Sequence, residues 1–140
     1  MNGVTEEMKS ILSDFLFIFP LGAAGYCLLE VLWRGYTHWT MALAGGICFC
    51  CIYAIFCVKK RKILLQCLLC ALAVTCVEFI FGCIVNLFFH MDVWDYSYLP
   101  FQFMGQICLP YTALWFLLSI PLSALCRQLN AVIRKLEQSA

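Results

Sequence analysis

The sequence predicts an all-α fold: an integral membrane four-helix bundle with amphipathic surface helices at its N- and C-terminal ends. Of the 140 residues, 64% are hydrophobic and 12% are charged, and the mean hydropathy is +0.91. Soluble domains carry about 25% charged residues, so this composition is typical of a membrane protein. The apolar residues fall into four runs, each near the roughly 20 residues that cross a bilayer. We expect a single transmembrane domain over residues 1–140.

The first two spans are predicted over residues 15–33 and 39–58. An amphipathic segment at residues 4–14 precedes the first span, and it either lies on the membrane surface or extends that span. Both spans contain small residues, which let membrane helices approach closely. These are Gly22, Ala23 and Gly25 in the first span and Gly45 and Gly46 in the second.

The third and fourth spans are predicted over residues 63–89 and 104–125. In the third span Glu78, Gly82 and Asn86 are four residues apart, which places them on one helical stripe. Residues 126–140 are basic and amphipathic, a pattern typical of a helix on the inner membrane surface.

Charge predicts the orientation of the chain. Residues 59–62 read Lys-Lys-Arg-Lys between the second and third spans, and an excess of Lys and Arg marks cytoplasmic loops. With four spans, both termini of this multi-pass protein of the cell (inner or plasma) membrane are then cytoplasmic. The loops at residues 34–38 and 90–103 lie on the outer side.

Polar and aromatic side chains gather at the two outer loops and in the spans below them. Glu78 lies about 16 Å below the end of its span at 1.5 Å per residue. A charged acid at the bilayer centre costs at least about 2.5–3.5 kcal/mol, so Glu78 must be protonated, paired or in contact with a wet cavity. Trp and Tyr are enriched where membrane meets water. The candidate ligand-binding residues are Glu30, Trp33, Arg34, His38, Trp39, Glu78, Asn86, Trp94, Asp95 and Gln106.

These residues predict a convergent polar pocket that opens to the outer face. In this hypothesis Glu30 and Glu78 face each other and respond to protons or cations. Arg34 and His38 engage an anionic group, and the tryptophans frame the entrance. The alternative is that the polar groups hold the four helices together, since interhelical hydrogen bonds in membranes average about 0.6 kcal/mol each.

Other chemistries find less support in the sequence. The chain is cysteine-rich, with 11 cysteines, but nearly all lie in apolar runs, where a thiol acts as a small hydrophobe. Cys67 and Cys70 have the spacing of a metal or redox pair, without a second pair or a nearby His. We assign no metal ligand, no catalytic residue and no cofactor. The basic residues are grouped along the chain rather than spread over a phosphate-binding face, so we expect no nucleic-acid partner.

Several motifs resemble the putative type IV ABC-transporter permease family of small bacterial membrane proteins (CmpB-like). The resemblance implies a four-helix protein of the bacterial inner membrane, named as a permease. It rests on Gly25-Tyr26, Glu30-x-x-Trp33-Arg34-Gly35, Thr37-His38-Trp39-Thr40-Met41, Gly45-Gly46, Glu78-Phe79-x-x-Gly82 with Asn86, Trp94-Asp95-Tyr96-Ser97 and Gly105-Gln106-Ile107-Cys108.

The predicted function is that of a membrane transport-associated, ABC permease-like protein that binds a small polar or amphiphilic ligand in the outward-facing pocket. Two alternatives stay open: a membrane-embedded enzyme acting on a lipid-like substrate, and a structural or regulatory subunit of a larger membrane complex. The predicted partner is the lipid bilayer. A second copy of the chain, a transporter ATPase and another membrane subunit are further partners that the sequence leaves open.

Overall fold

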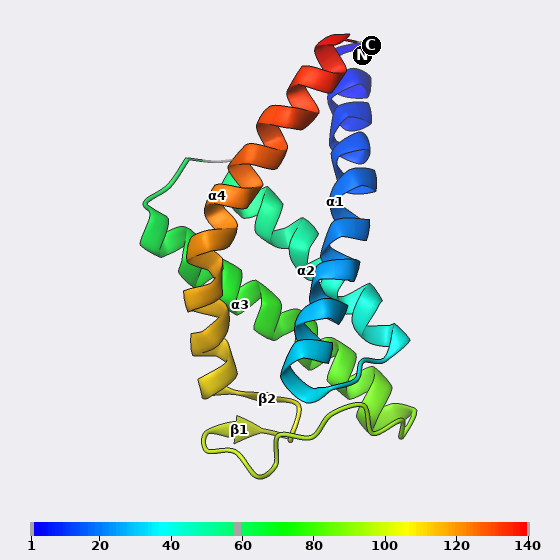
Figure 1. Ribbon diagram of the computed structural model, residues 1–140, viewed down its shortest axis with the longest axis vertical. Helices are drawn as coiled ribbons and strands as arrows, with labels where there is room; N and C mark the ends of the chain where they lie inside the picture. Colours follow the sequence, from blue (N-terminus) through cyan, green and yellow to red (C-terminus); the bar gives the residue numbers. More distant parts are fainter. Residues whose placement is uncertain (1, 58–59, 140) are drawn as a thin grey trace. The chain divides into compact units, whose positions relative to one another are not determined.

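The fold is all-α, as predicted (Figure 1). The computed structural model describes residues 2–57 and 60–139, with the backbone alone for residues 2–9. The predicted end of the second span at residue 58 and the first lysine of the basic run, Lys59, lie outside the described residues. The elements in order are α1 (Asn2–Arg34), α2 (Trp39–Cys57), α3 (Ile63–Gly82), the π-helix η1 (Cys83–Phe88), the strands β1 (Gln102–Phe103) and β2 (Ile107–Cys108), and α4 (Leu109–Ser139).

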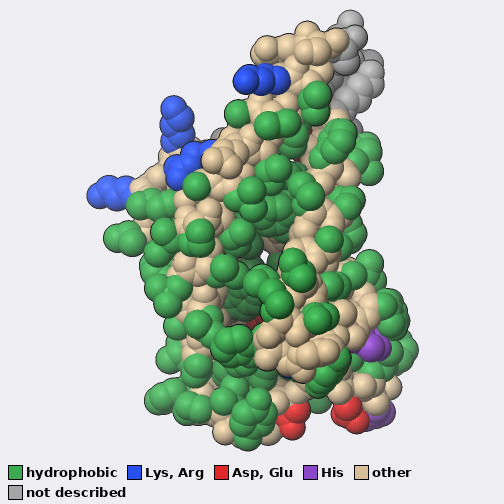
Figure 2. All heavy atoms as spheres, viewed as in Figure 1, with side chains coloured by type: hydrophobic (Ala, Val, Ile, Leu, Met, Phe, Trp, Pro, Cys, Tyr) green, Lys and Arg blue, Asp and Glu red, His purple; other side chains and the backbone are tan. Residues whose placement is uncertain are grey.

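All four α-helices contain a stretch that is long and apolar enough to cross a membrane. Large apolar side chains cover the visible surface of these helices (Figure 2). Leu32 is 74% exposed, Leu16 69% and Leu64 67%, although leucine is among the residues most often buried in soluble proteins. The protein is therefore a membrane protein whose helices contact the lipid bilayer.

The amphipathic segments at the two ends are continuous with the neighbouring spans. α1 runs unbroken from Asn2 to Arg34, and α4 from Leu109 to Ser139. The N-terminal segment thus takes the second of the two forms expected of it, an extension of the first span. The C-terminal segment is likewise the last part of α4 and not a separate helix.

The fourth helix begins later than predicted. We expected the span to start at about residue 104, but Gln102–Phe103 and Ile107–Cys108 pair as a short antiparallel hairpin before α4 begins at Leu109. The residues that precede the helix are apolar, and hydropathy alone does not distinguish an apolar loop from a helix. Pro110 occupies the first turn of α4, where its missing N–H is tolerated.

The chain forms two compact units, which are described separately. The first contains the described chain up to Cys50 together with the segment that begins at Val132. The second contains Cys51–Ala131. The boundaries fall inside α2 and α4 and not in loops. A single transmembrane domain stays a prediction.

In the first unit, α1 and α2 pack through glycines. A Cβ atom placed on Gly22 would lie 2.7 Å from the carbonyl oxygen of Gly45, and one on Gly46 would lie 2.5 Å from the Phe19 ring. Small residues permit this approach of two backbones, as the sequence predicted. Gly25 differs, because a Cβ atom there would meet nothing within 4 Å.

Candidate functional site

The predicted site residues divide between the two units. Glu30, Trp33, Arg34, His38 and Trp39 belong to the first unit, and Glu78, Asn86, Trp94, Asp95 and Gln106 belong to the second. Each group forms local contacts of its own. The predicted meeting of Glu30 and Glu78 in one hollow stays a prediction.

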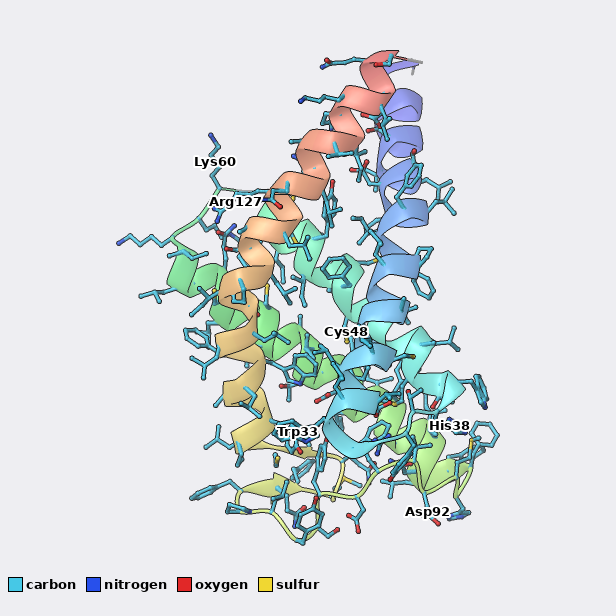
Figure 3. The ribbon with its side chains drawn as sticks, in the orientation of Figure 1. Trp33, His38, Cys48, Lys60, Asp92 and Arg127 are labelled. Carbon is cyan, nitrogen blue, oxygen red and sulfur yellow. The ribbon has the colours of Figure 1, made fainter. Side chains whose placement is uncertain are left out.

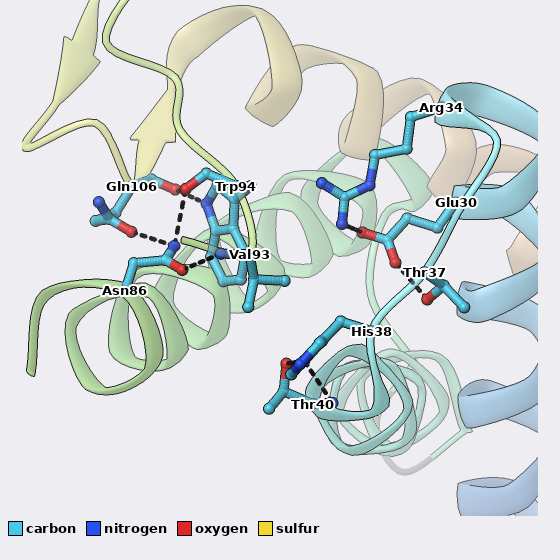
Figure 4. A network of polar contacts seen from close by, with 9 residues as sticks. All are labelled: Glu30, Arg34, Thr37, His38, Thr40, Asn86, Val93, Trp94 and Gln106. Atoms are coloured by element: carbon cyan, nitrogen blue, oxygen red, sulfur yellow. Dashed lines mark hydrogen bonds and ion pairs between the residues drawn. The ribbon is translucent and has the colours of Figure 1, made fainter. Parts of the chain in front are cut away.

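A carboxylate, a guanidinium and a hydroxyl form the polar cluster at the end of α1. The helix stops because Gly35 adopts the left-handed conformation, with φ of 84°, while its N–H donates to the carbonyl of Val31 at 2.9 Å. The following turn brings Thr37 back toward the helix. Glu30 therefore accepts one hydrogen bond from Arg34 and another from Thr37, both at 2.5 Å (Figure 4).

An aromatic ring lies beside this cluster. The Arg34 guanidinium lies 4.6 Å from the centre of the Tyr36 ring, a distance at which a cation is attracted to the ring face. The side chains of Glu30 and Arg34 are 13% and 20% exposed. Trp33 and Trp39 are exposed, and their place at the membrane–water boundary stays a prediction.

His38 caps the start of α2. Its Nδ1 lies 2.8 Å from the Thr40 hydroxyl oxygen and accepts the backbone N–H of Thr40 at 3.4 Å (Figure 4). An acceptor at the residue before the helix satisfies one of the unpaired N–H groups of the first turn. A capping role for His38 is not apparent from sequence, since histidine is not a preferred cap residue.

In the second unit, Asn86 ties the end of η1 to the loop that follows. Its Nδ2 donates to the Trp94 carbonyl at 2.9 Å and to Gln106 Oε1 at 2.8 Å, while its Oδ1 accepts the Val93 N–H at 2.7 Å (Figure 4). The Trp94 indole N–H donates to the Gln106 carbonyl at 3.0 Å. We call these four residues the Asn86 knot. Asn86, Trp94 and Gln106 are buried, and their polar groups bond mainly to one another.

Two local features of the backbone make room for the knot. Gly82 ends α3 where the Gln106 side chain packs against it; a Cβ atom there would lie 2.5 Å from Gln106 Oε1. The chain then widens into the π-helix η1, whose end is marked by a hydrogen bond from the Phe89 N–H to the carbonyl of Ile84 at 3.0 Å. Gly82 and Asn86 thus lie on the buried side, as the predicted stripe requires.

The loop between η1 and α4 contains strained backbone. His90, Asp92, Phe101 and Met104 all have positive φ, between 47° and 54°. For bulky residues such as Phe101 and Met104 this region is sterically unfavourable. Strain of this kind persists only where surrounding contacts fix the chain, and the Asn86 knot and the β1–β2 hairpin supply such contacts.

Asp95 shapes one turn of this loop. Its Oδ1 accepts the Ser97 backbone N–H at 2.8 Å and the Ser97 hydroxyl at 2.5 Å. These hydrogen bonds stabilise the carboxylate and hold the pKa of Asp95 below its ordinary value. Gly105 lies close by, where a Cβ atom would come within 2.7 Å of the same oxygen.

We expect the Asp95 turn to open only in acid. Since the folded-state pKa is lowered, the stabilising contribution is complete above the unfolded value of about 3.9 and is lost as the pH falls through the folded value. The measurement is the chemical shift of the Ser97 amide between pH 2 and pH 6. The shift should move below pH 4 in the native protein and stay constant in Asp95→Asn. The same titration in both proteins would contradict this assignment.

Glu78 is buried within α3 and is 4% exposed. It accepts a hydrogen bond from the Trp115 indole at 3.1 Å. One turn away, the hydroxyls of Thr75 and Thr112 share a hydrogen bond of 2.9 Å. These residues form a polar ladder between α3 and α4. The sequence requires Glu78 to be protonated, paired or in contact with a wet cavity, and the structure shows an indole donor beside it.

The sequence analysis missed the partners in this ladder. The detectable signal is a matching spacing, since Thr75 and Glu78 are three residues apart on α3, and Thr112 and Trp115 are three apart on α4. Residues at this spacing lie on one helix face. The structure joins these two faces through both pairs, Thr75 with Thr112 and Glu78 with Trp115.

A second cluster that the sequence analysis did not assign lies in the first unit. Arg134 contacts Asp14 at 2.5 Å, Glu137 at 2.6 Å and the Ser10 hydroxyl at 2.7 Å. Asp14 is buried. The cluster fastens the last segment of α4 to α1 within this unit, which explains why a carboxylate is tolerated at the start of an apolar span.

No group of three or more His, Cys, Asp or Glu within the described ranges is arranged to hold a metal ion. All eleven cysteines are free, and Cys48, Cys67, Cys70, Cys108 and Cys126 are buried. Buried free thiols of this kind pack as small apolar side chains.

In the part of the chain that the structure describes, four helices long and apolar enough to cross a membrane and several buried polar clusters define a small membrane protein. A family model described as Putative ABC-transporter type IV matches residues 15–140. The chain belongs to this ABC-transporter-related family, which confirms the resemblance seen in its sequence. Comparison with curated proteins and with solved structures gave no match.

Proposed function

We propose that the protein is a transport-associated, ABC permease-like subunit that binds a small polar or amphiphilic ligand on the outer side of the cell membrane. The observation that carries this proposal is Glu78, a carboxyl group that is 4% exposed inside a membrane-crossing helix. Ionisable residues in such positions are costly and mark ligand, ion or proton pathways by default. Membership of an ABC-transporter-related family supports a role in transport.

Glu78 is the proton-responsive group in this proposal. Its carboxylate form accepts the Trp115 N–H at 3.1 Å, whereas its protonated form gains an O–H donor of its own. The neighbouring hydroxyls of Thr75 and Thr112 extend the polar path along the helices. Protonation therefore turns Glu78 from a hydrogen-bond acceptor into a group that can also donate, and this changes the hydrogen bonds of the ladder.

The Glu30 cluster is the proposed contact for an anionic ligand group. Arg34 is paired with Glu30 and stacked on Tyr36, so its guanidinium is already oriented. An incoming carboxylate or phosphate competes with Glu30 for Arg34, and His38 presents its imidazole ring from the start of α2. In this proposal the indole side chains of Trp33 and Trp39 lie at the membrane–water boundary and keep the cluster at that depth.

The Asn86 knot and Asp95 are proposed to shape the loop between η1 and α4, in contrast to the ligand contacts proposed for the Glu30 cluster. The polar groups of Asn86, Trp94 and Gln106 are bonded within the loop, and Asp95 is bonded to Ser97. We assign these residues to shaping the outer loop and not to binding the ligand directly.

The proposed orientation rests on the basic residues. Lys60, Arg61 and Lys62 follow α2, and the positive-inside rule places such a loop in the cytoplasm together with both termini. The proposed partners beside the bilayer are a transporter ATPase, another membrane subunit or a second copy of this chain.

The test compares Glu78→Gln with the native protein after purification in detergent. We expect the native protein to show a carboxyl band in its pH-dependent infrared difference spectrum that Glu78→Gln lacks. Native mass spectrometry should also show that any small molecule retained by the native protein is lost. The control is Glu137→Gln, which removes an exposed carboxyl and should keep both signals.

Trp115→Phe supplies a second variant, because it removes only the indole donor. It should shift the infrared band without abolishing it. If Glu78→Gln fails to accumulate in membranes while Trp115→Phe leaves the spectrum unchanged, Glu78 holds helices together and the proposal is wrong.

A structural or regulatory subunit is the second candidate function. The observation that favours it is the Asn86 knot, whose buried polar groups stabilise the loop itself. Co-purification of one stoichiometric protein, with no small molecule retained, would support this function over ligand binding.

A further inference from the structure

Four exposed basic residues meet where α2 ends, α3 begins and α4 passes. Lys60, Arg61 and Lys62 lie in the α2–α3 connection and Arg127 lies on α4, all within the second unit. We call this group the basic corner. Basic side chains gather on this part of the visible surface in Figure 2, and Figure 3 labels Lys60 and Arg127.

Hydrogen bonds between the helices hold the corner together. The Cys57 thiol donates to the carbonyl of Cys126 at 3.6 Å, which places the end of α2 beside the residue before Arg127. Gln66 Nε2 donates to the carbonyl of Ile55 at 3.0 Å and so joins the first turns of α3 to the last turn of α2. The end of α2 therefore lies beside the part of α4 that carries Arg127 and beside the first turns of α3.

A third bond fixes α4 on the same side. The Tyr53 hydroxyl donates to Asn130 Oδ1 at 2.9 Å, and Tyr53 is buried. Asn130 lies one turn beyond Arg127. The backbone that carries the four charges is thus anchored by buried side chains, while the charged groups themselves are exposed.

No acidic side chain of the second unit balances the corner. In the sequence of that unit the acids are Glu78, Asp92 and Asp95. Glu78 is 16 positions after Lys62, a distance of about 24 Å along a helix, and the other two follow it in the loop beyond η1. Arg127 donates instead to the neutral Ser123 hydroxyl at 3.0 Å.

The corner lies at the edge of the lipid-contacting surface. Directly after Lys62, the apolar side chains of Ile63, Leu64 and Leu65 are all exposed, and Leu125 is exposed two residues before Arg127. Apolar side chains that a bilayer covers are therefore continuous with the basic group. Basic side chains that border a lipid-covered surface are suited to contact anionic headgroups.

The start of α3 adds to the positive potential. α3 begins at Ile63, and Lys62 at its N-cap makes no side-chain capping bond. The N-terminus of a helix carries a partial positive charge and favours anions. The N-terminus of α3 thus adds to the positive potential of the basic corner, most of which comes from the four charged side chains.

We propose that the basic corner binds the phosphate group of an anionic phospholipid from the surrounding bilayer. Clusters of Lys and Arg next to a membrane span attract anionic lipids, and Arg matches phosphate geometry with two parallel N–H donors. The lipid chains lie against the exposed leucines of α3 while the headgroup lies among the basic side chains. This proposal does not depend on the transport function.

The experiment measures which lipid stays bound. The protein is reconstituted into nanodiscs with equal amounts of phosphatidylglycerol and phosphatidylcholine, released, and analysed by native mass spectrometry. We expect the native protein to retain phosphatidylglycerol in about tenfold preference. The variant Lys60→Gln, Arg61→Gln, Lys62→Gln, Arg127→Gln should show no preference.

A matched pair of single variants distinguishes the corner from net charge. Arg127→Gln and Lys135→Gln each remove one positive charge from α4, but only Arg127 belongs to the corner. We expect Arg127→Gln to lower the preference several-fold and Lys135→Gln to leave it unchanged. Equal effects of the two variants would overturn the proposal. No preference in the native protein would also overturn it, and would favour an acidic protein as the partner of the corner.

A competition experiment distinguishes the lipid from free phosphate. Inorganic phosphate at millimolar concentration should not displace the retained lipid; displacement would identify free phosphate as the ligand instead.

Discussion

Replacement of Asn86 by alanine is expected to lower the free energy of unfolding by about 3 kcal/mol or more. The substitution removes three hydrogen bonds, to the Val93 N–H, the Trp94 carbonyl and the Gln106 side chain. Each buried polar group left without its partner costs about 1–3 kcal/mol. The measurement is reversible unfolding in mixed detergent micelles, followed by circular dichroism and tryptophan fluorescence.

The fluorescence signal tests the location of the effect. Trp94 is buried in the knot, so Asn86→Ala should shift its emission to longer wavelength before the helices unfold. Gln128→Ala is the control, because Gln128 is exposed on α4. Equal midpoints for Asn86→Ala and Gln128→Ala would show that the knot does not stabilise the loop.

Replacement of Gly45 by alanine is expected to destabilise the first unit by about 1–3 kcal/mol. A Cβ atom at this position would overlap the Tyr26 side chain and lie 3.0 Å from the carbonyl oxygen of Gly22. Since backbone atoms are among the contacts, a change of rotamer does not relieve the overlap. The measurement is the same unfolding assay.

Gly25→Ala is the matched control for Gly45→Ala. Gly25 lies in α1, and a Cβ atom placed on it would have no neighbour within 4 Å. Alanine is about 1 kcal/mol more favourable than glycine within a helix. This variant should be as stable as the native protein or slightly more stable. A loss of stability in Gly25→Ala equal to that in Gly45→Ala would contradict the packing of α1 on α2 through glycine.

The sequence predicts the fold well because bilayer crossing depends on length and hydropathy, which can be counted. The prediction that is wrong is the start of the fourth helix, which begins at Leu109 and not near residue 104. Phe101, Phe103 and Met104 are apolar, yet they belong to the loop and hairpin before this helix. Two of these residues have positive φ. Such conformations depend on contacts formed after folding, and residue type alone does not reveal them.

The sequence identifies the residue types of the polar clusters but not most of their hydrogen-bond partners. Glu30 and Arg34 form the pair that their spacing permits. Asn86 and Gln106, two of the predicted ligand residues, bond to each other across twenty positions, and their role in ligand binding stays a prediction. Trp115 was not assigned, although it is the hydrogen-bond donor to Glu78. Partners that are distant in sequence cannot be paired without knowledge of helix rotation.

The π-helix η1 makes the number of residues in this stretch as important as their identity. Its hydrogen bonds span five residues where an α-helix spans four, so this wider turn accommodates an additional residue between Gly82 and the loop. Deletion of one residue from Cys83–Phe88 would rotate Asn86 away from Gln106, whereas we expect apolar substitutions of the exposed side chains of Ile84, Leu87 and Phe88 to be tolerated. The loop between η1 and α4 is thus more sensitive to insertions and deletions than to most substitutions.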